Sequence, residues 1–136
     1  MDIQAAVRKA GLAKIELGPG YVCLLRDGVI RLPDGEDNRD LHQYRTVVVL
    51  SNNFLCTSLY CPLVTVAPTS HKLNRRNATE IVVRQSLDNG LTYDSRIMLA
   101  HIQPVIKTDI DRKLGELSLA DWENLMTQIV KNFDRA

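Results

Sequence analysis

The sequence predicts a mainly β fold, in which a strongly curved antiparallel sheet or small barrel is followed by a C-terminal helix. Apolar, β-branched runs recur at short intervals between residues 21 and 106, and turn-forming residues separate them. No helical pattern lies between these runs, and the clearest helical pattern begins only after Ser118. Short strands joined by close turns favour antiparallel pairing and strong curvature.

The composition is that of a single soluble domain. The chain has 136 residues, 45% of them hydrophobic and 24% charged. Its 17 Lys and Arg stand against 16 Asp and Glu, so the net charge is only +1 and any attraction to nucleic acid must be local. The N-terminus lacks a signal-peptide pattern, and aliphatic runs such as residues 47–50 are too short to span a membrane. We therefore expect a cytoplasmic protein that does not bind membranes.

The three cysteines, Cys23, Cys56 and Cys61, cannot all pair within the chain, which suits a reducing compartment. Cys56 and Cys61 with His71 are conceivable metal ligands, but their spacing matches no usual zinc pattern and a fourth ligand is missing. We expect buried or half-buried thiols, no metal and no cofactor.

Residues 1–20 are expected to form an N-terminal extension, and residues 21–136 the main domain. Asp2 can cap a short helix that ends before Gly11, and a Gly-Pro-Gly turn at residues 18–20 leads into the first strand. The apolar positions of this helix follow helical spacing: Ile3, Ala6, Val7 and Ala10.

The first strand of the main domain is predicted at residues 21–25, and Asp27 with Gly28 would end or bend it. Residues 34–43 are the least apolar long segment, which predicts a lid or a partner-binding loop. The other predicted strands lie at residues 46–51, 63–66, 80–83, 95–99 and 102–106. Of these, residues 46–51 and 63–66 are continuous β-branched runs and should be largely buried on both faces.

The C-terminal helix should begin at Ser118, a good N-cap, with Asp121 in its first turn. Its apolar positions form one helical stripe, which we expect to lie in the core and to close the barrel. Trp122→Ala should be the most damaging single truncation. The stripe consists of Leu119, Trp122, Leu125, Met126, Ile129, Val130 and Phe133.

Two strand ends carry residues suited to chemistry on a phosphate. Arg45 precedes the strand at 46–51, and Thr69 and Ser70 follow the strand at 63–66. A guanidinium offers a fork of donors to phosphate oxygens, and a hydroxyl adds a hydrogen bond without a competing charge. A solvated surface arginine and an ordinary Pro-Thr-Ser turn remain the alternative.

Five segments in this order resemble the MazF/PemK toxins, and the likeness extends over about residues 21–133. The resemblance implies a small SH3-like β-barrel with a C-terminal helix, assembled as a homodimer, that cleaves single-stranded RNA without a metal and is inhibited by a cognate antitoxin. The segments are YVCLL (21–25), RTVVVLSN (45–52), VTVAPTS (64–70), GLTYDS (90–95) and KLGELS (113–118).

The resemblance further implies that Arg45 and Thr69 are the catalytic residues. The neighbouring 2′-hydroxyl would attack phosphorus and give a 2′,3′-cyclic phosphate, with Arg45 stabilising the phosphorane and Ser70 as an auxiliary donor. The general base stays unassigned, and His42 is a candidate because it lies close to Arg45 in sequence. An ordinary loop histidine is the alternative. Arg45→Ala is expected to lower the rate about 10² to 10³-fold or more and to leave stability nearly unchanged.

A basic segment follows Thr69 and Ser70, and we expect it to bind RNA phosphates. It spans residues 71–84, where Lys72, Arg75, Arg76 and Arg84 stand against Glu80. Tyr44 and Tyr93 are expected to stack on RNA bases, although core or rim positions would explain them as well. An acidic antitoxin tail would compete for the same surface. A solvated basic loop without function is the alternative.

Two departures from the family pattern keep other functions open. Thr46 stands where the family usually places proline, and His101-Ile102-Gln103 replaces the usual Gln-Ile followed by a basic residue. A noncatalytic toxin of the same fold that binds a protein target, as CcdB-type toxins do, is the first alternative. A catalytically silent adaptor and an unrelated small barrel that acts as a binding module are the others.

Overall fold

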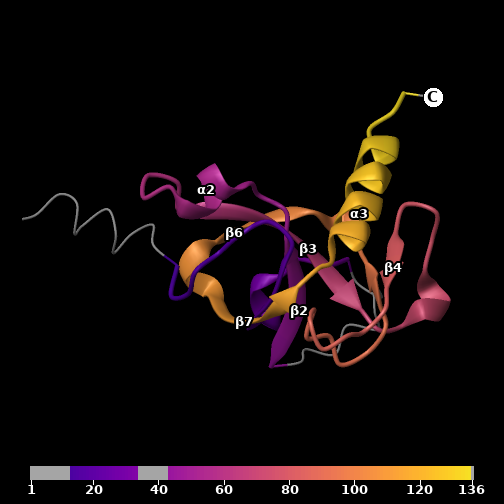
Figure 1. Cartoon of the computed structure of the whole chain (residues 1–136), viewed down its shortest axis with the longest axis horizontal. Coiled ribbons are helices and arrows are strands. Elements are labelled where there is room, and N and C mark those ends of the chain that lie inside the picture. The colour runs from indigo at the N-terminus through magenta and orange to yellow at the C-terminus, as the bar shows by residue number, and fades with distance from the viewer. Residues whose placement is uncertain (1–12, 34–42, 136) are drawn as a thin grey trace, which may run out of the picture.

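A computed structural model of the chain describes residues 13–33 and 43–135. The expected N-terminal helix, most of the acidic segment 34–43 and His42 lie outside the described residues. The described part forms a seven-stranded antiparallel sheet with a helix at the C-terminal end (Figure 1). The predicted class, mainly β with a C-terminal helix, is confirmed.

The secondary structure is dominated by short strands. The strands are β1 (Tyr21–Arg26), β2 (Tyr44–Val49), β3 (Leu63–Ser70), β4 (Ile81–Val83), β5 (Ser95–Ile97), β6 (Gln103–Ile106) and β7 (Ile110–Glu116). The α-helices are α2 (Asn53–Thr57) and α3 (Leu119–Asn132). Single 3-10 turns lie at η1 (Asp27–Val29), η3 (Leu73–Arg75), η4 (Leu99–His101) and η5 (Lys107–Asp109).

The strand β3 organises the sheet, whose order is β4-β5-β3-β2-β1-β7. One edge of β3 pairs with β2, and its other edge is shared between β6 at Val64 and β5 at Thr69. This division curves the sheet around β3, as expected for an SH3-like barrel. Within the described residues the hydrogen bonding does not close, because β4 and β7 remain the two ends of the strand path.

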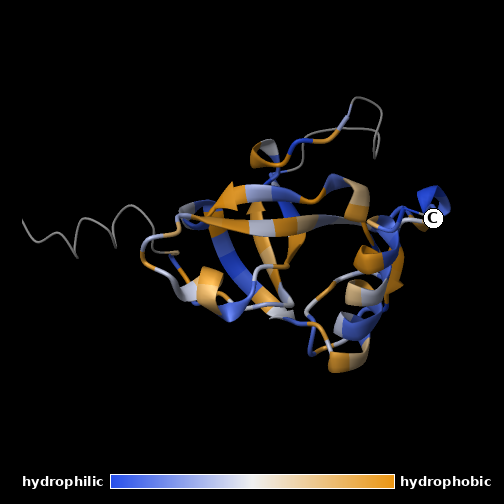
Figure 2. Cartoon of the chain, turned by 90° about the horizontal axis from the view of Figure 1, so that it is seen from above, coloured by the Kyte–Doolittle hydropathy of each residue, from blue (hydrophilic) through white to orange (hydrophobic). Residues whose placement is uncertain are grey.

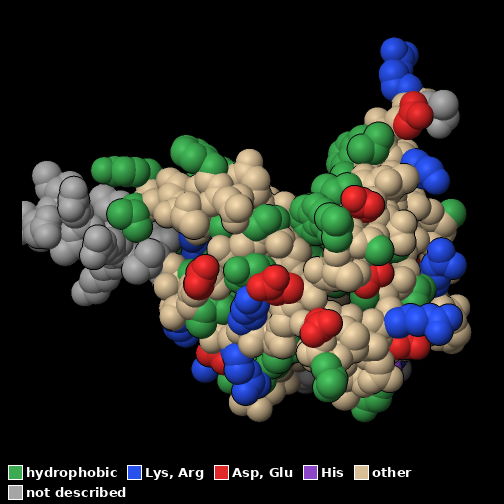
Figure 3. All heavy atoms as spheres, viewed as in Figure 1, with side chains coloured by type: hydrophobic (Ala, Val, Ile, Leu, Met, Phe, Trp, Pro, Cys, Tyr) green, Lys and Arg blue, Asp and Glu red, His purple; other side chains and the backbone are tan. Residues whose placement is uncertain are grey.

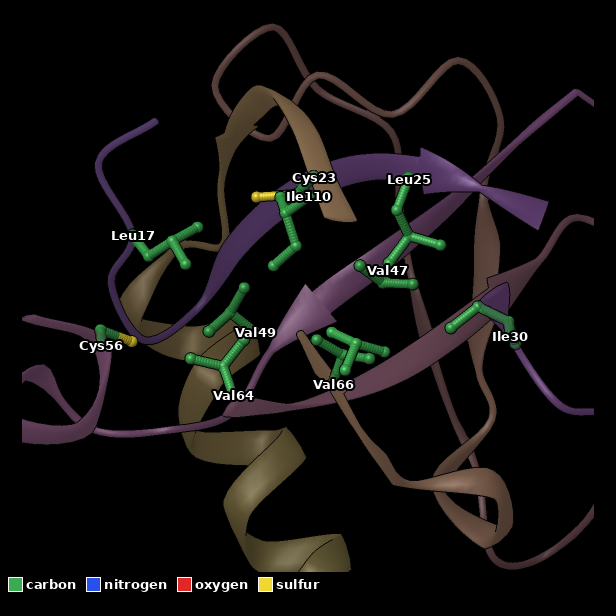
Figure 4. Close-up of a cluster of buried hydrophobic side chains, with 11 residues drawn as sticks. Leu17, Cys23, Leu25, Ile30, Val47, Val49, Cys56, Val64, Val66 and Ile110 are labelled. Carbon is green, nitrogen blue, oxygen red and sulfur yellow. The ribbon is translucent and has the colours of Figure 1, made fainter. Parts of the chain in front are cut away.

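Both faces of the central strands are buried, as the continuous apolar runs predict. Val47 and Val49 of β2 point into one hydrophobic cluster, which also contains Leu25 and Val66, whereas Val48 belongs to a second cluster on the other face (Figure 4). Apolar stretches accordingly run along the central strands (Figure 2). A strand between two cores needs no polar face, which explains the sequence of β2.

The strand predicted at residues 63–66 ends later than expected, and two elements were missed. Pro68, Thr69 and Ser70 belong to β3 itself, although the alternative interpretation made them a turn. The edge strand β7 was missed because Asp111, Arg112 and Lys113 are exposed and hide its β pattern. The helix α2 was missed because it has only five residues, although Asn52 caps it by accepting from Leu55 N.

The helix α3 begins as predicted, with Ser118 Oγ accepting from Asp121 N at 3.1 Å. Its apolar stripe is only partly core. Leu125 is fully buried, and three neighbours pack partly against the same cluster: Trp122, Met126 and Ile129. The expectation was wrong for Leu119, Val130 and Phe133, which are exposed. Val130 and Phe133 belong to the C-terminal end of the helix, which rises away from the sheet (Figure 1).

Two glycines allow the turn before Leu91 to touch β7. Gly90 has φ +69°, and a Cβ on it would lie 2.2 Å from Leu114 O. A Cβ on Gly115 would lie 2.2 Å from Asp88 O, next to the hydrogen bond from Glu116 N to Asp88 O at 2.9 Å. This backbone contact fixes the start of the segment 90–95.

The chain already packs on the sheet before β1 begins. Leu17 is buried in the first cluster, and Gly20 N donates to Val49 O at 2.8 Å. The division of the chain at residue 20 stays a prediction. Among the described helices, none is long and apolar enough to cross a membrane.

Candidate active site

Arg45 is a buried and oriented cation. Its Nε donates to Asp27 Oδ1 at 2.7 Å, and its Nη1 donates to the carbonyl oxygen of Thr69 at 3.1 Å. Only 7% of Arg45 is exposed, so the alternative of a solvated surface arginine is wrong. A guanidinium tied to a carboxylate and to a strand carbonyl has a fixed direction, which is what recognition of a phosphate requires.

Asp27 is the partner that the sequence did not reveal. It was interpreted as a residue that ends or bends the first strand, but it is fully buried at the start of η1, directly after β1. The antiparallel register places Leu25 of β1 opposite Arg45 of β2, and this pairing brings the carboxylate under the guanidinium. An acidic residue just after an apolar strand was the available signal, but only the strand pairing makes it specific.

Thr69 and Ser70 lie in β3 between β2 and β5. Thr69 Oγ1 donates to Thr46 O at 3.2 Å, and Ser70 Oγ accepts from Lys72 N at 3.2 Å. Both residues are buried. Thr69 and Ser70 therefore belong to a strand, and the interpretation as a turn was wrong.

Arg45, Thr69 and Ser70 line a hollow of about 230 Å³, which we call the Arg45 hollow. The structure thus brings together five of the predicted site residues: Tyr44, Arg45, Thr69, Ser70 and Tyr93. The prediction of His42 remains untested. The remaining lining residues are Thr46, His71, Leu91, Thr92 and Ser95.

The segment before β5 forms one wall of the hollow. The buried side chain of Asn89 accepts from Leu91 N at 2.9 Å and donates to Arg84 O at 2.8 Å, which fixes the turn ahead of this wall. Tyr93 is 58% exposed. The centroids of its ring and of the His71 ring lie 5.0 Å apart, and the two ring planes are tilted by 33°. His71 had been considered only as a metal ligand, so its place in the hollow was missed.

The basic segment begins at the edge of the hollow and moves away from it. Lys72 is half-buried, whereas Arg75 and Arg76 are exposed. Arg76 lines a separate groove between β4 and α3. Glu80, the acidic residue of the segment, is buried and forms an ion pair with Arg96 at 2.9 Å. Because this carboxylate is internal, it does not offset the positive surface of the segment.

The cysteines are free, and none lines the Arg45 hollow. Burial raises the pKa of the Cys23 thiol to about 12 and also raises the pKa of Cys56. Cys61, which is half-buried, donates to Leu63 O at 3.3 Å. Buried thiols with raised pKa values are poor nucleophiles and poor metal ligands. In residues 13–33 and 43–135, no group of three or more His, Cys, Asp and Glu side chains can hold a metal ion.

The family model of the PemK-like, MazF-like toxin of type II toxin–antitoxin systems matches residues 28–133. The structure is similar to the Mycobacterium tuberculosis toxin MazF-mt6, with a TM-score of 0.63 and 23% sequence identity over 84% of this chain and 96% of that toxin. No curated protein matches the sequence.

Two solved complexes share the fold at lower identity. A mycobacterial endoribonuclease in complex with its cognate antitoxin has a TM-score of 0.61 and 16% identity, over 88% of this chain and 99% of that chain. The MazE–MazF structure from Deinococcus radiodurans has a TM-score of 0.61 and 12% identity, over 90% of this chain and 100% of that chain.

Proposed function

The chain belongs to the PemK-like, MazF-like family of toxins of type II toxin–antitoxin systems, and on this premise we propose that it is a metal-independent endoribonuclease that cleaves single-stranded RNA. One observation supports the proposal most strongly. Arg45, held by Asp27 at 2.7 Å, shares a hollow with the hydroxyls of Thr69 and Ser70. Fixed donors placed where charge develops are the usual means of stabilising a phosphorane.

In the proposed reaction the 2′-hydroxyl attacks the adjacent phosphorus. The O2′–P bond forms, the P–O5′ bond breaks, and the products carry a 2′,3′-cyclic phosphate and a 5′-hydroxyl. Arg45 donates to the phosphorane oxygens. Thr69 turns its hydroxyl from Thr46 O, which it contacts at 3.2 Å, to a non-bridging oxygen, and Ser70 is an auxiliary donor.

Binding of the RNA strand would use the residues around the hollow. Tyr44 lines the hollow and offers a ring to a neighbouring base. Lys72 and Arg75 lead away from Ser70 and would contact the next phosphates. Arg76 belongs to the groove beside α3 and would contact phosphates farther along the strand.

The partners of the toxin would be an antitoxin and a second copy of the chain. A related mycobacterial endoribonuclease was solved with its cognate antitoxin, and a Deinococcus MazF with MazE. An acidic antitoxin tail would place carboxylates where RNA phosphates bind near Arg45 and Arg75. Leu119, Val130 and Phe133 are 72%, 71% and 79% exposed. Hydrophobic side chains are visible over α3 on the face seen in Figure 3, and this exposed apolar surface supports a homodimer that covers it.

Incubation of the purified protein with a long unstructured RNA in EDTA tests the proposal. We expect cleavage at defined positions, with 2′,3′-cyclic phosphate and 5′-hydroxyl ends. A matched RNA with a single 2′-deoxynucleotide on the 5′ side of a mapped cleavage site should resist cleavage there. Cleavage of the 2′-deoxy RNA, or cleavage that needs added metal, would contradict the mechanism.

A further inference from the structure

The Arg45 hollow is rich in hydrogen-bond donors and poor in groups that take up a proton. Guanidinium groups, aliphatic hydroxyls and phenols all hold their protons near neutral pH. The carboxylate that contacts Arg45 is that of Asp27, which is fully buried and therefore closed to RNA. No carboxylate lines the hollow in the described part of the chain. Yet the proposed reaction must remove the proton of the attacking 2′-hydroxyl.

His71 is placed to supply this missing acceptor. It follows Ser70 directly at the end of β3, lines the same hollow as Arg45 and Thr69, and is exposed. Imidazole is the side chain that accepts and releases protons between about pH 5 and 8. Among the described residues that line the hollow, His71 is the one with this property.

We propose that His71 is the general base of the RNA cleavage proposed above, and this inference rests on that function. Neutral imidazole takes the proton of the 2′-hydroxyl as the O2′–P bond forms. The P–O5′ bond breaks, and the 5′ oxygen takes a proton from water. The imidazolium then returns its proton to water, so that the enzyme is regenerated.

The surroundings of His71 restrict its ring without enclosing it. The ring centroids of His71 and Tyr93 lie 5.0 Å apart, so the Tyr93 ring packs against the imidazole. Besides Tyr93, the titratable or charged groups around His71 are Tyr44 and Arg45 on β2 and Lys72, the next residue in the chain. Tyr93 and these three residues are unchanged when His71 alone is replaced, so a change in pH dependence can be assigned to the imidazole.

The closing experiment compares His71→Phe with His71→Ala. Phenylalanine keeps a ring for contact with Tyr93 and with a base but cannot take a proton, whereas alanine loses both. The control is His101→Gln, because His101 lies in a different hollow beside Gln103. Rates are measured under single turnover on an RNA with a mapped cleavage site, and affinity is measured with the 2′-deoxy form of the same RNA.

We expect both His71 variants to cleave about 10² to 10⁴-fold more slowly than the unchanged protein, as loss of a general base requires. His71→Phe should bind the 2′-deoxy RNA with nearly unchanged affinity, and His101→Gln should cleave at the normal rate. The rate of the unchanged protein should fall as the pH is lowered through the range of imidazole titration. The His71 variants should lack this acidic fall.

If the unchanged protein cleaves RNA in EDTA, three outcomes would overturn the role of His71 and leave the proposed function in place. His71→Phe could cleave at the normal rate while His71→Ala binds weakly, which would make His71 a stacking residue. His71→Phe could retain the acidic fall. His42→Ala could remove that fall, which would assign the base to His42. If the unchanged protein cleaves no RNA, the proposed function fails and the inference with it. His71→Gln replaces any variant whose circular dichroism shows unfolding.

Discussion

Arg45 and Asp27 form a buried ion pair, and this pairing revises the expectation that Arg45→Ala leaves stability unchanged. Removal of the guanidinium would leave the fully buried Asp27 carboxylate without this cation. Loss of one partner of a buried pair costs roughly 3 to 5 kcal/mol. Arg45→Ala should therefore lower the free energy of unfolding by about that amount, measured by urea denaturation.

The double variant Arg45→Ala with Asp27→Asn is the control for this prediction. It removes both charges, so it should regain a large part of the stability that Arg45→Ala loses. If Arg45→Ala is as stable as the unchanged protein, the ion pair does not have the energetic role assigned to it.

Asp27 is predicted to position Arg45 without touching RNA. In the unchanged protein Arg45 Nε lies 2.7 Å from the Asp27 carboxylate. Asp27→Asn keeps an oxygen that can accept from Nε but removes the negative charge that fixes the guanidinium. We expect kcat to fall about tenfold or more with little change in KM, because small misplacements of a catalytic group are costly. Glu116→Gln, which removes the exposed ion pair with Lys113, is the matched control. Equal kcat values for the two variants would argue against the positioning role.

Single site residues could be predicted from the sequence where they lie at the end of a predicted strand. Arg45, Thr69 and Ser70 could be placed together because two apolar runs predict neighbouring strands. Asp27 could not, because its contact with Arg45 depends on the register between β1 and β2. His71 could not, because nothing local shows that the segment before β5 would bring Tyr93 against it.

The helix α3 is the element whose energetics differ most from the expectation. Leu125 is fully buried, whereas Leu119 is 72% exposed, although both belong to the predicted stripe. Leu125→Ala should lower the free energy of unfolding by roughly 2 to 5 kcal/mol. Leu119→Ala should change it by less than about 0.5 kcal/mol. Trp122 is half-buried, so it is no longer expected to be the most damaging site.

Denaturation of both variants as dilute monomers checks this prediction, since dimer contacts at Leu119 would otherwise add to its effect. Similar losses for Leu119→Ala and Leu125→Ala would mean that the whole stripe is buried.

Elements with strong hydrophobic patterns were predictable, and elements defined by tertiary contacts were not. The strand β2 and the start of α3 follow from apolar patterning and from the Ser118 cap. The strand β7 presents charged residues on an exposed edge and is a strand because β1 pairs with it. Its contact with the turn at Gly90 is likewise a tertiary feature.

The charge of the whole molecule conceals a local asymmetry. Basic and acidic side chains are mixed over the face seen in Figure 3, in keeping with the net charge of +1. The segment after Ser70 differs, because its acidic residue Glu80 is internal and its basic residues are not. Affinity for RNA should therefore depend on a small part of the surface.

Replacement of Lys72, Arg75 and Arg76 together by glutamine tests this surface. Fewer counterions would be released on binding, so affinity should fall and the slope of log affinity against log salt should become shallower by roughly 0.7 for each lost phosphate contact. The cleavage sequence should stay the same. Filter binding with 2′-deoxy RNA at several salt concentrations gives the slope, and an unchanged slope with an altered cleavage sequence would assign these residues to base recognition.

The most direct test of the central claim is the single-turnover cleavage rate, in EDTA, of the double variant Arg45→Ala with Asp27→Asn. This variant removes the guanidinium from the hollow without leaving the buried carboxylate behind. With the fold verified by circular dichroism, its rate should lie about 10² to 10³-fold or more below that of the unchanged protein, as the loss of a preorganised donor requires. A folded double variant that cleaves within about threefold of the unchanged rate would show that Arg45 does not stabilise the transition state.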